Sequence, residues 1–461
     1  MRQGVIAAIS TPPGKGGVAI IRTSGVGAFA LAERVFFPRS GKPLSAYPAR
    51  TQVYGYIKDK DEVVDDGLAT LFPAGSSYTG EETVEYAIHG GVLVTRRVLE
   101  VILAAGAIPA EAGEFTRTAF INGRLGLTEA EAIGDLLEAK SYEQLKLSSE
   151  PARKRLAARI EELRSSLVRL LGSIWARIDY PEEDLGELSD EEIIADLKRV
   201  REGLRALIST YRTGRAIKEG VSTVLVGKPN AGKSTLYNLL VGEEAAIVTS
   251  IPGTTRDVLE RSVPLGRVLL NLCDTAGVHS EGVTDEVELI GIRRTKSRIG
   301  EAELLLALFD SSRELDEADR EVIAEISAAS GAKIAILTKC DLGEAKSKID
   351  ETGFDAVIKI SAEADPEAAV SAIRGEVERL FTDEKISSSA DAIVASARQH
   401  SALSAALGYI DSAISGAELG IPADAASSDI ELCLSSLGEV DGRSVSDEVV
   451  SDIFSRFCVG K

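Results

Sequence analysis

One stretch, VSTVLVGKPNAGKST over residues 221–235, restricts the fold of this chain more than any other part of the sequence. Its apolar, β-branched start predicts a strand that ends at Gly227, and the spacing from Gly227 to Gly232, Lys233 and Ser234 matches the phosphate-binding loop G-x-x-x-x-G-K-[ST]. The next residues, LYNLLVGEEA, have apolar positions at helical spacing, so the loop also begins a helix whose N-terminal amides favour a polyphosphate. We expect Lys233 to neutralise the β- and γ-phosphate oxygens and Ser234 to bind Mg²⁺. A strand, loop and helix in this order favour a nucleotide site over an ordinary glycine-rich turn.

Length and composition limit what else the chain can be. With 461 residues it is too long for one hydrophobic core, and about three domains are expected. A net charge of −20 argues against non-specific binding to nucleic acid or to an anionic membrane, so any RNA contact needs a local basic patch. The four cysteines, at 273, 340, 433 and 458, have no disulfide or metal spacing. No signal peptide and no apolar run of membrane-spanning length can be read, so we expect a cytoplasmic protein.

Periodicity divides the chain into four segments. Short β-like runs with one helix predict an α/β or α+β domain over residues 1–118, and residues 119–218 have helical periodicity throughout. In that segment Thr128-Glu-Ala-Glu resembles a helix-opening capping box, and a further helix is expected from Leu188 to about Gly214. Strands and helices alternate over 219–380, the order of a doubly wound, mainly parallel sheet, and helical character returns over 381–461. We infer an α/β domain inserted into an all-helical domain.

Two features of the flanking segments allow more than one interpretation. Polar clusters such as Ser77-Tyr-Thr-Gly-Glu-Glu and His89-Gly-Gly lie at the expected turns of the first domain, and they suit either a ligand site or ordinary tight turns. A run of basic residues on the first long helix alternates with Glu, which favours a solvated helix face over an RNA-binding surface.

Short motifs downstream of the phosphate loop identify the base. They are Gly253-Thr-Thr-Arg-Asp257, Asp274-Thr-Ala-Gly277, Thr338-Lys-Cys-Asp341 and Ser361-Ala-Glu363, each at or after the carboxyl end of an expected strand. A carboxylate at 341 can accept from both guanine N–H donors, and adenine offers no such pair, so the expected base is guanine. We expect Lys339 to lie along the base plane and the Ser361-Ala362 loop to donate an amide to the guanine oxygen.

The phosphate end of the expected site has its own set of residues. Asp274 can hold the Mg²⁺ hydration shell, Thr255 is the expected second Mg²⁺ ligand and Gly277 can sense the γ-phosphate. The residue after this glycine is Val278, not the water-orienting Gln of Ras-like switches, so another residue must place the attacking water. The acidic candidates are Asp285, Glu286 and Glu288, and periodicity does not choose among them.

The ordered motifs GKPNAGKST, IPGTTRD and DTAG, inside an interrupted helical domain that closes on Phe457-Cys-Val-Gly-Lys461, resemble the MnmE (TrmE) family of tRNA-modification GTPases. The resemblance runs end to end, because TPPGKGGVAIIR, SYTGEETVEYAIHGG and GEFTRTAFINGRLGLTEAEAI look like the N-terminal motifs of that family. It implies a folate-binding-like N-terminal α/β domain, an all-helical central domain and an inserted Ras-like G domain. It also implies a homodimer that works with the flavoprotein MnmG, as a heterotetramer, on the wobble uridine of certain tRNAs. The implied product carries an aminomethyl or carboxymethylaminomethyl group at carbon 5.

The resemblance also implies cofactors and the residues that hold them. Besides GTP and Mg²⁺ these are K⁺ and 5-formyltetrahydrofolate or a related tetrahydrofolate, which supplies or mimics the one-carbon unit. The match puts folate contacts at Arg22, Glu85, Arg124 and the terminal Lys461, and K⁺ ligands at Asn230, Thr249, Ile251 and Thr254. Glu288 matches the glutamate that orients water when two G domains dimerise, and Cys458 matches the cysteine of the C-terminal motif, with a chemical role. The full expected set of GTP contacts is Asn230, Ala231, Gly232, Lys233, Ser234, Thr235, Thr249, Ser250, Ile251, Pro252, Gly253, Thr254, Thr255, Asp274, Thr275, Ala276, Gly277, Thr338, Lys339, Asp341, Ser361 and Ala362.

Two positions depart from the family pattern. Thr338 stands where Asn is usual, and we expect its shorter side chain to lose the reach of the amide to the base and to the phosphate loop. Arg124 stands where Lys is common, which keeps the charge. Two other function classes remain open: a ribosome-assembly or regulatory GTPase acting as a binding module, which would leave the N-terminal loops and Cys458 unexplained, and an adenine-nucleotide enzyme, which Asp341 disfavours.

Overall fold

The computed structural model describes residues 4–179, 189–242, 260–273, 298–343, 349–419, 421, 423–444, 446–455 and 457–460. The contacts between Cα atoms divide the chain into two compact units. The first combines Met1–Gly134 with Gly438–Lys461, and the second is Asp135–Leu437. The last residues of the predicted C-terminal helical segment therefore pack with the N-terminal unit, while the rest of that segment stays in the second unit.

The first unit is built on a seven-stranded sheet in the order β3-β4-β5-β6-β2-β1-β7. Every strand pair is antiparallel except β1 with β7. The short β-like runs expected over residues 1–118 all form strands of this sheet. The bounds are β1 Ile6–Ile9, β2 Val18–Ser24, β3 Phe36–Pro38, β4 Gln52–Asp59, β5 Glu62–Phe72, β6 Thr83–His89 and β7 Ile108–Pro109.

Helices cover both faces of this sheet. Helices α1 (Ala28–Val35) and α2 (Val92–Ala104) pack on one face, where Ile21, Tyr86 and Val98 are among the fully buried core side chains. The other face carries α3 (Glu114–Ile121), whose Phe115 packs against Ile6 and Ala8. Alternate residues of β2 and β6 therefore point to α3, and they include two of the predicted folate contacts, Arg22 and Glu85.

The start of α4 (Leu127–Glu138) corrects one prediction about a helix cap. Thr128 does not cap this helix, because the helix begins one residue earlier. The backbone N–H of Gly126 instead donates to the carboxylate of Glu129, over 2.9 Å. The Thr128 hydroxyl donates to the carbonyl of Val440 over 2.7 Å, which ties α4 to the end of α14 (Ala423–Asp441). Near this junction, Phe454 of α15 (Asp447–Ser455) packs against Leu127.

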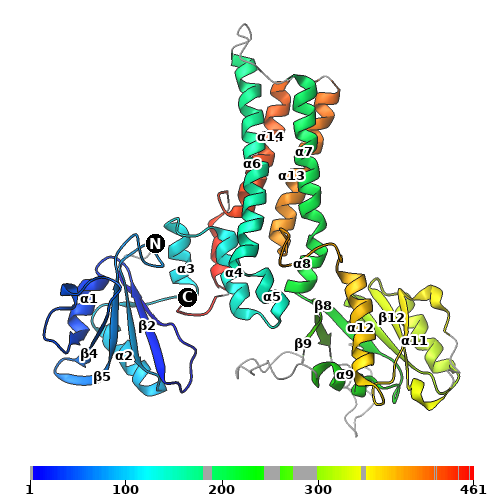
Figure 1. Ribbon diagram of the computed structural model, residues 1–461, viewed down its shortest axis with the longest axis horizontal. Coiled ribbons are helices and arrows are strands. Elements are labelled where there is room, and N and C mark those ends of the chain that lie inside the picture. Colours follow the sequence, from blue (N-terminus) through cyan, green and yellow to red (C-terminus); the bar gives the residue numbers. More distant parts are fainter. Residues whose placement is uncertain are drawn as a thin grey trace, which may run out of the picture. The chain divides into compact units, whose positions relative to one another are not determined.

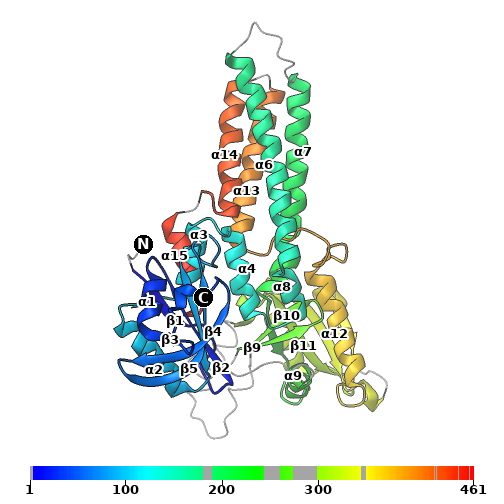
Figure 2. The same cartoon turned by 60° about the vertical axis from the view of Figure 1, so that its left-hand side comes forward.

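The helical part of the second unit comes from both sides of the nucleotide-binding segment, as predicted. Helices α6, α7, α13 and α14 run side by side (Figure 1, Figure 2). The bounds are α5 Tyr142–Leu147, α6 Glu150–Asp179, α7 Asp190–Ser209, α8 Tyr211–Lys218 and α13 Ala397–Glu418. The helix expected to run to Gly214 is broken at Thr210, whose hydroxyl donates to the Leu207 carbonyl and accepts from the Val394 N–H. This bond fixes the chain just before α13 to the joint between α7 and α8.

The inserted domain is a six-stranded sheet in the order β13-β12-β11-β8-β10-β9, parallel except for the edge strand β9. Its core side chains place α9 and α12 on one face and α11 on the other, which confirms the doubly wound arrangement. The strands are β8 Val221–Val226, β9 Glu260–Leu265, β10 Val268–Cys273, β11 Leu304–Asp310, β12 Ala332–Thr338 and β13 Ala356–Lys359. The helices are α9 Lys233–Gly242, α11 Glu317–Ser327 and α12 Pro366–Phe381. In such a sheet, ligands bind beyond the carboxyl ends of the strands.

None of the helices in the described ranges has the length and apolar character that crossing a membrane requires.

Candidate functional site

The phosphate loop leaves β8 at Gly227 and enters α9 at Lys233. Gly227 has φ 149°, and a Cβ there would lie 2.6 Å from the carbonyl oxygen of Leu308 on the neighbouring strand, so only glycine fits. The Lys233 ammonium donates to the carbonyl oxygens of Gly227, at 2.5 Å, and Lys228, at 2.7 Å. Burial of the ammonium lowers the pKa of Lys233. The loop thus holds its lysine within the curve of its own backbone.

The loop also positions the side chains expected to bind cations. Asn230 is exposed and has φ 64°, a left-handed backbone conformation that asparagine tolerates better than most residues. Ser234 is exposed in the first turn of α9, directly after Lys233. A carboxamide oxygen and a hydroxyl oxygen at the start of a helix suit K⁺ and Mg²⁺, so the donor atoms of Asn230 and Ser234 fit the ions predicted there.

Thr338, the last residue of β12, corrects the prediction made for this position. Its hydroxyl lies 2.9 Å from the carbonyl oxygen of Ala231 in the phosphate loop and 3.2 Å from that of Phe309. The side chain is buried, and its methyl carbon would lie 3.6 Å from a Cβ added to Gly232 in the phosphate loop. Thr338 therefore does reach the phosphate loop, because the parallel strands bring the end of β12 close enough for a short side chain.

The rest of the guanine motif forms a tight turn after β12. Lys339 has φ 58° and begins a 3₁₀ turn, Cys340–Leu342, that carries Asp341. The Asp341 carboxylate accepts from the Ser361 hydroxyl over 2.5 Å, so the two expected base-binding loops meet. Asp310, at the end of β11, binds the Lys339 ammonium over 2.8 Å, and it belongs to none of the motifs predicted from sequence. The signal for it was present, since LLLALFD is an apolar strand that ends in a single acid.

The structure brings eleven of the predicted GTP contacts to one edge of the sheet, beyond the ends of β8, β12 and β13. They are Asn230, Ala231, Gly232, Lys233, Ser234, Thr235, Thr338, Lys339, Asp341, Ser361 and Ala362. The remaining predicted contacts lie outside the described residues. These are Thr249, Ser250, Ile251, Pro252, Gly253, Thr254, Thr255, Asp274, Thr275, Ala276 and Gly277, together with Glu288 and Lys461.

In the first unit, two predicted folate contacts are bonded to each other. Arg22 on β2 and Glu85 on β6 are register partners, and the guanidinium donates twice to one carboxylate oxygen, over 2.9 and 2.8 Å. The same guanidinium lies 5.5 Å from the ring centroids of both Tyr78 and Phe115. The Tyr78 hydroxyl is in turn 3.0 Å from that of Thr116 on α3. This arrangement holds a cation and an anion on the sheet face that α3 covers. The carboxylate can accept N–H groups of a pterin, and the guanidinium can donate to a carboxylate or a carbonyl oxygen.

Arg124, the third predicted folate contact, is exposed beyond the end of α3. Its side chain lies against the loop that precedes β6, because a Cβ on Gly80 would be 3.3 Å from the Arg124 Cγ. The Asn122 amide donates to the Thr79 carbonyl over 2.7 Å and holds this turn in place. The SYTGEE cluster is therefore tied to the predicted folate residues rather than being an isolated turn.

The C-terminal motif also returns to this region. Val459 forms an antiparallel bridge with Ala112, just before α3, and the Gly460 carbonyl accepts from the Ser10 hydroxyl over 3.1 Å. Ser10 directly follows β1, whose Ala8 is the register partner of Arg22. Cys458, the residue directly before these two anchors, is exposed. The structure thus brings residues more than four hundred positions apart in sequence, such as Ser10 and Gly460, into one region of the first unit.

A cavity of about 800 Å³ lies on the same face of the sheet, between the end of β2 and α3. One face of α3 lines it with Glu114, Arg117 and Thr118, and Ser24 and Glu81 lie opposite. Burial raises the pKa of Glu81. Arg22, Glu85 and Arg124 do not line this cavity, so the predicted folate contacts and the cavity are separate features of the first unit.

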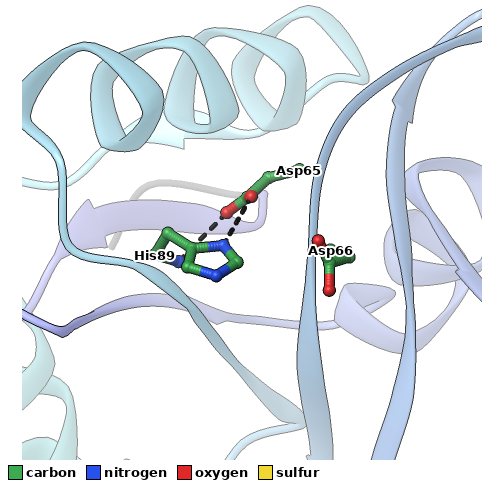
Figure 3. Close-up of side chains that lie close together, drawn as sticks. All are labelled: Asp65, Asp66 and His89. Atoms are coloured by element: carbon green, nitrogen blue, oxygen red, sulfur yellow. Dashed lines mark hydrogen bonds and ion pairs between the residues drawn. The ribbon is translucent and has the colours of Figure 1, made fainter.

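His89 explains the remaining polar cluster of the first unit as a turn anchor. Its ring Nδ1 lies 2.8 Å from one Asp65 oxygen, and its backbone N–H donates to the other over 3.0 Å (Figure 3). Asp66, the neighbouring carboxylate in Figure 3, accepts from the Tyr54 hydroxyl over 2.8 Å. The side chains of Asp65, Asp66 and His89 lie close enough together to contact one metal ion, but each already has a protein partner. The hydrogen bond to Asp65 raises the pKa of His89.

Two family models and several full-length proteins are similar to this chain. The family model described as "GTP-binding protein TrmE N-terminus" matches residues 5–124, and that described as "MnmE helical domain" matches residues 127–458. The protein named tRNA modification GTPase MnmE of Lacticaseibacillus paracasei is 37% identical over 99% of this chain and 98% of its own length. The protein of the same name from Thermotoga sp. strain RQ2 is 39% identical over 99% of both chains. The solved G domain of the FeoB iron transporter of T. maritima matches 35% of this chain and 98% of its own, with 26% identity and a TM-score of 0.25. From the family models and the full-length relatives we conclude that the chain belongs to the MnmE family of tRNA modification GTPases.

Proposed function

We propose that this GTPase modifies the wobble uridine of certain tRNAs, together with the flavoprotein MnmG. The product would carry an aminomethyl or carboxymethylaminomethyl group on carbon 5 of the base. The observation that supports this most is the return of the C-terminal motif to the first unit. Val459 pairs with Ala112, and Gly460 bonds to Ser10, in the region where Arg22 and Glu85 present a cation and an anion. A GTPase that acted only as a binding module would have no need for this arrangement.

In this proposal the first unit binds a tetrahydrofolate, with 5-formyltetrahydrofolate as the closest testable compound. The carboxylate of Glu85 can accept N–H groups of a pterin, and Arg22 can donate to an oxygen. Arg124 is exposed and cationic, which suits the glutamate carboxylates of the ligand. The folate would supply or mimic the one-carbon unit, and Cys458 is exposed close to this region, with Lys461 as the terminal contact.

GTP hydrolysis in this proposal depends on a cation and on dimerisation. Asn230, Thr249, Ile251 and Thr254 would hold K⁺, and its charge would replace that of an arginine finger. Ser234 and Thr255 would hold Mg²⁺. Glu288 would orient the attacking water when two G domains of a homodimer meet. Among the described residues, Asn230 and Ser234 support the part of this proposal that concerns the phosphate loop, because both residues are exposed there.

Isothermal titration of the full chain with 5-formyltetrahydrofolate tests the proposal. We expect saturable binding that Glu85→Gln weakens about tenfold or more, because the variant removes the charge of the carboxylate. A matched control is Asp65→Asn, which removes a carboxylate from the same sheet but from the turn anchor at His89, and it should bind folate normally. Absence of binding by the wild-type chain would favour a regulatory or ribosome-assembly GTPase instead.

A further inference from the structure

Strand β11 ends in an acid that is held on three sides. The six residues before Asp310 are apolar and buried, and Asp310 itself is only 8% exposed. One carboxylate oxygen accepts from the backbone N–H of Ser312, at 3.0 Å, and from the Ser312 hydroxyl, at 2.6 Å. The other accepts from the Lys339 ammonium at 2.8 Å. The two bonds from Ser312 therefore orient the carboxylate independently of Lys339.

Lys339 reaches this carboxylate through an uncommon backbone conformation. Its φ of 58° and ψ of 36° are left-handed, which costs a residue with a Cβ about 1–2 kcal/mol. The parallel register of β11 and β12 pairs Asp310 with Thr338, so Lys339 is the first residue beyond the sheet on that side. An ion pair with a fixed, nearly buried carboxylate offsets the backbone strain and restrains the otherwise flexible side chain.

We propose that Asp310 is a positioning residue for guanine recognition, which holds the methylene chain of Lys339 along the plane where the base stacks. This inference rests on the guanine site of the proposed function. Asp310 acts on the nucleotide only through Lys339, whereas Asp341 would contact the base edge directly. The ion pair also neutralises the charge of the ammonium, so the methylene chain of Lys339 presents an apolar surface to the base.

The position of the pair distinguishes it from an ordinary ion pair of the fold. Immediately before β11, at the opposite end of the strand, Glu303 binds Arg215 of α8 and also accepts from the Ser222 N–H at 3.2 Å. Both acids flank the same strand, and each combines a side-chain cation with a backbone N–H. Glu303 lies at the edge away from the phosphate loop, so it provides a matched control for loss of an ion pair.

The test is the affinity of the full chain for fluorescent mant-GDP and for mant-IDP, whose base lacks the 2-amino group. We expect Asp310→Asn to weaken both about tenfold and by the same factor, because loss of one charge-assisted bond affects stacking and not the base edge. Glu303→Gln should leave both affinities within about twofold of wild type. Asp341→Asn, in contrast, should change the ratio between the two nucleotides.

Two further variants, Lys339→Met and Ser312→Ala, test whether Asp310 acts through Lys339. Lys339→Met should weaken binding, and Asp310→Asn should cause little further loss in that background, since its partner is already gone. Ser312→Ala removes the hydroxyl bond to Asp310 and keeps the backbone N–H bond, so the affinity for both nucleotides should fall about two- to threefold, even if Asp310→Asn does not fold. Unchanged affinity in Ser312→Ala and Asp310→Asn, or a full additional loss in the Lys339→Met background, would overturn the inference. If the wild-type chain bound mant-ADP as well as mant-GDP, the guanine site itself would be wrong.

Discussion

The hydroxyl of Thr338 lies 2.9 Å from the carbonyl oxygen of Ala231, so the guanine motif and the phosphate loop are joined by a buried hydrogen bond. The two residues are 107 positions apart in sequence. They meet because β8 and β12 lie on either side of β11 in one parallel sheet, and their carboxyl ends share an edge. The bond connects the part of the site expected to select the base with the part expected to hold the phosphates.

Replacement of Thr338 by Val should therefore weaken guanine-nucleotide binding. The variant leaves the Ala231 carbonyl without this donor, which costs about 1–3 kcal/mol, so at the lower end mant-GDP affinity should fall about fivefold. Thr338→Ser keeps the hydroxyl and should bind nearly as wild type. Thr223→Val removes a similarly buried hydroxyl from mid-strand β8, where it bonds the Val221 carbonyl. The Thr223→Val control should lose stability but keep its affinity for mant-GDP. An equal loss of this affinity in both Val variants would show that the Thr338 bond has no specific role in nucleotide binding.

Potassium dependence should be lost when Asn230 is replaced by Ala. Asn230 is exposed on the phosphate loop. Of the four proposed K⁺ ligands, it is the one that lies within the described residues. Turnover of GTP by the wild-type chain should be faster in KCl than in NaCl at equal ionic strength, and the Asn230→Ala variant should show the same slow rate in both. Asn271→Ala removes an amide that binds the Glu219 carbonyl, away from the loop, and should keep the K⁺ response. Equal wild-type rates in the two salts would rule out the cation site.

Titration of His89 provides a check on the turn anchor. Since the bond to Asp65 raises the pKa of this exposed imidazole above its ordinary value of 6.5, the pair favours the protonated ring in the folded state. Its contribution to stability is therefore complete below pH 6.5 and is lost as the pH rises through the higher, folded-state pKa. The ¹H and ¹³C shifts of the ring should titrate above the ordinary value, and Asp65→Asn should bring the pKa back down. A wild-type ring that titrates at or below 6.5 would contradict the assignment.

Local patterns predicted most of the fold because periodicity reports burial directly. The strand–loop–helix at Gly227 and the strands β8, β10, β11, β12 and β13 all follow from apolar runs that end in polar motifs. Long-range partners were not predictable in the same way. Nothing near Thr128 indicates that its hydroxyl binds Val440 instead of capping α4, and the break at Thr210 depends on Val394, far along the chain.

The same difference between local sequence patterns and distant contacts decides which parts of the site can be predicted. The residue types at Lys233, Asp341 and Ser361 identify their chemistry from sequence, whereas Asp310 gains its role only from the three-dimensional approach of Lys339. Likewise, the reach of Thr338 to the phosphate loop depends on the spacing of parallel strands and not on the length of its side chain. The association of Cys458 with the region around Arg22 rested on family resemblance, and the described anchors at Ala112 and Ser10 now support it physically.

The proposed function requires that this GTPase modifies the wobble uridine of tRNA and that Cys458 takes part. The most direct measurement is the mass of tRNA nucleosides from a deletion strain that carries the wild-type gene, a Cys458→Ser variant or a Cys433→Ser variant. Cys433 is fully buried in α14 and serves as the matched control. We predict that the aminomethyl or carboxymethylaminomethyl uridine disappears on deletion, returns with wild type and Cys433→Ser, and stays absent with Cys458→Ser. Unchanged uridine modification in the deletion strain would show that this GTPase does not make the modified base, and full restoration by Cys458→Ser would show that Cys458 takes no part.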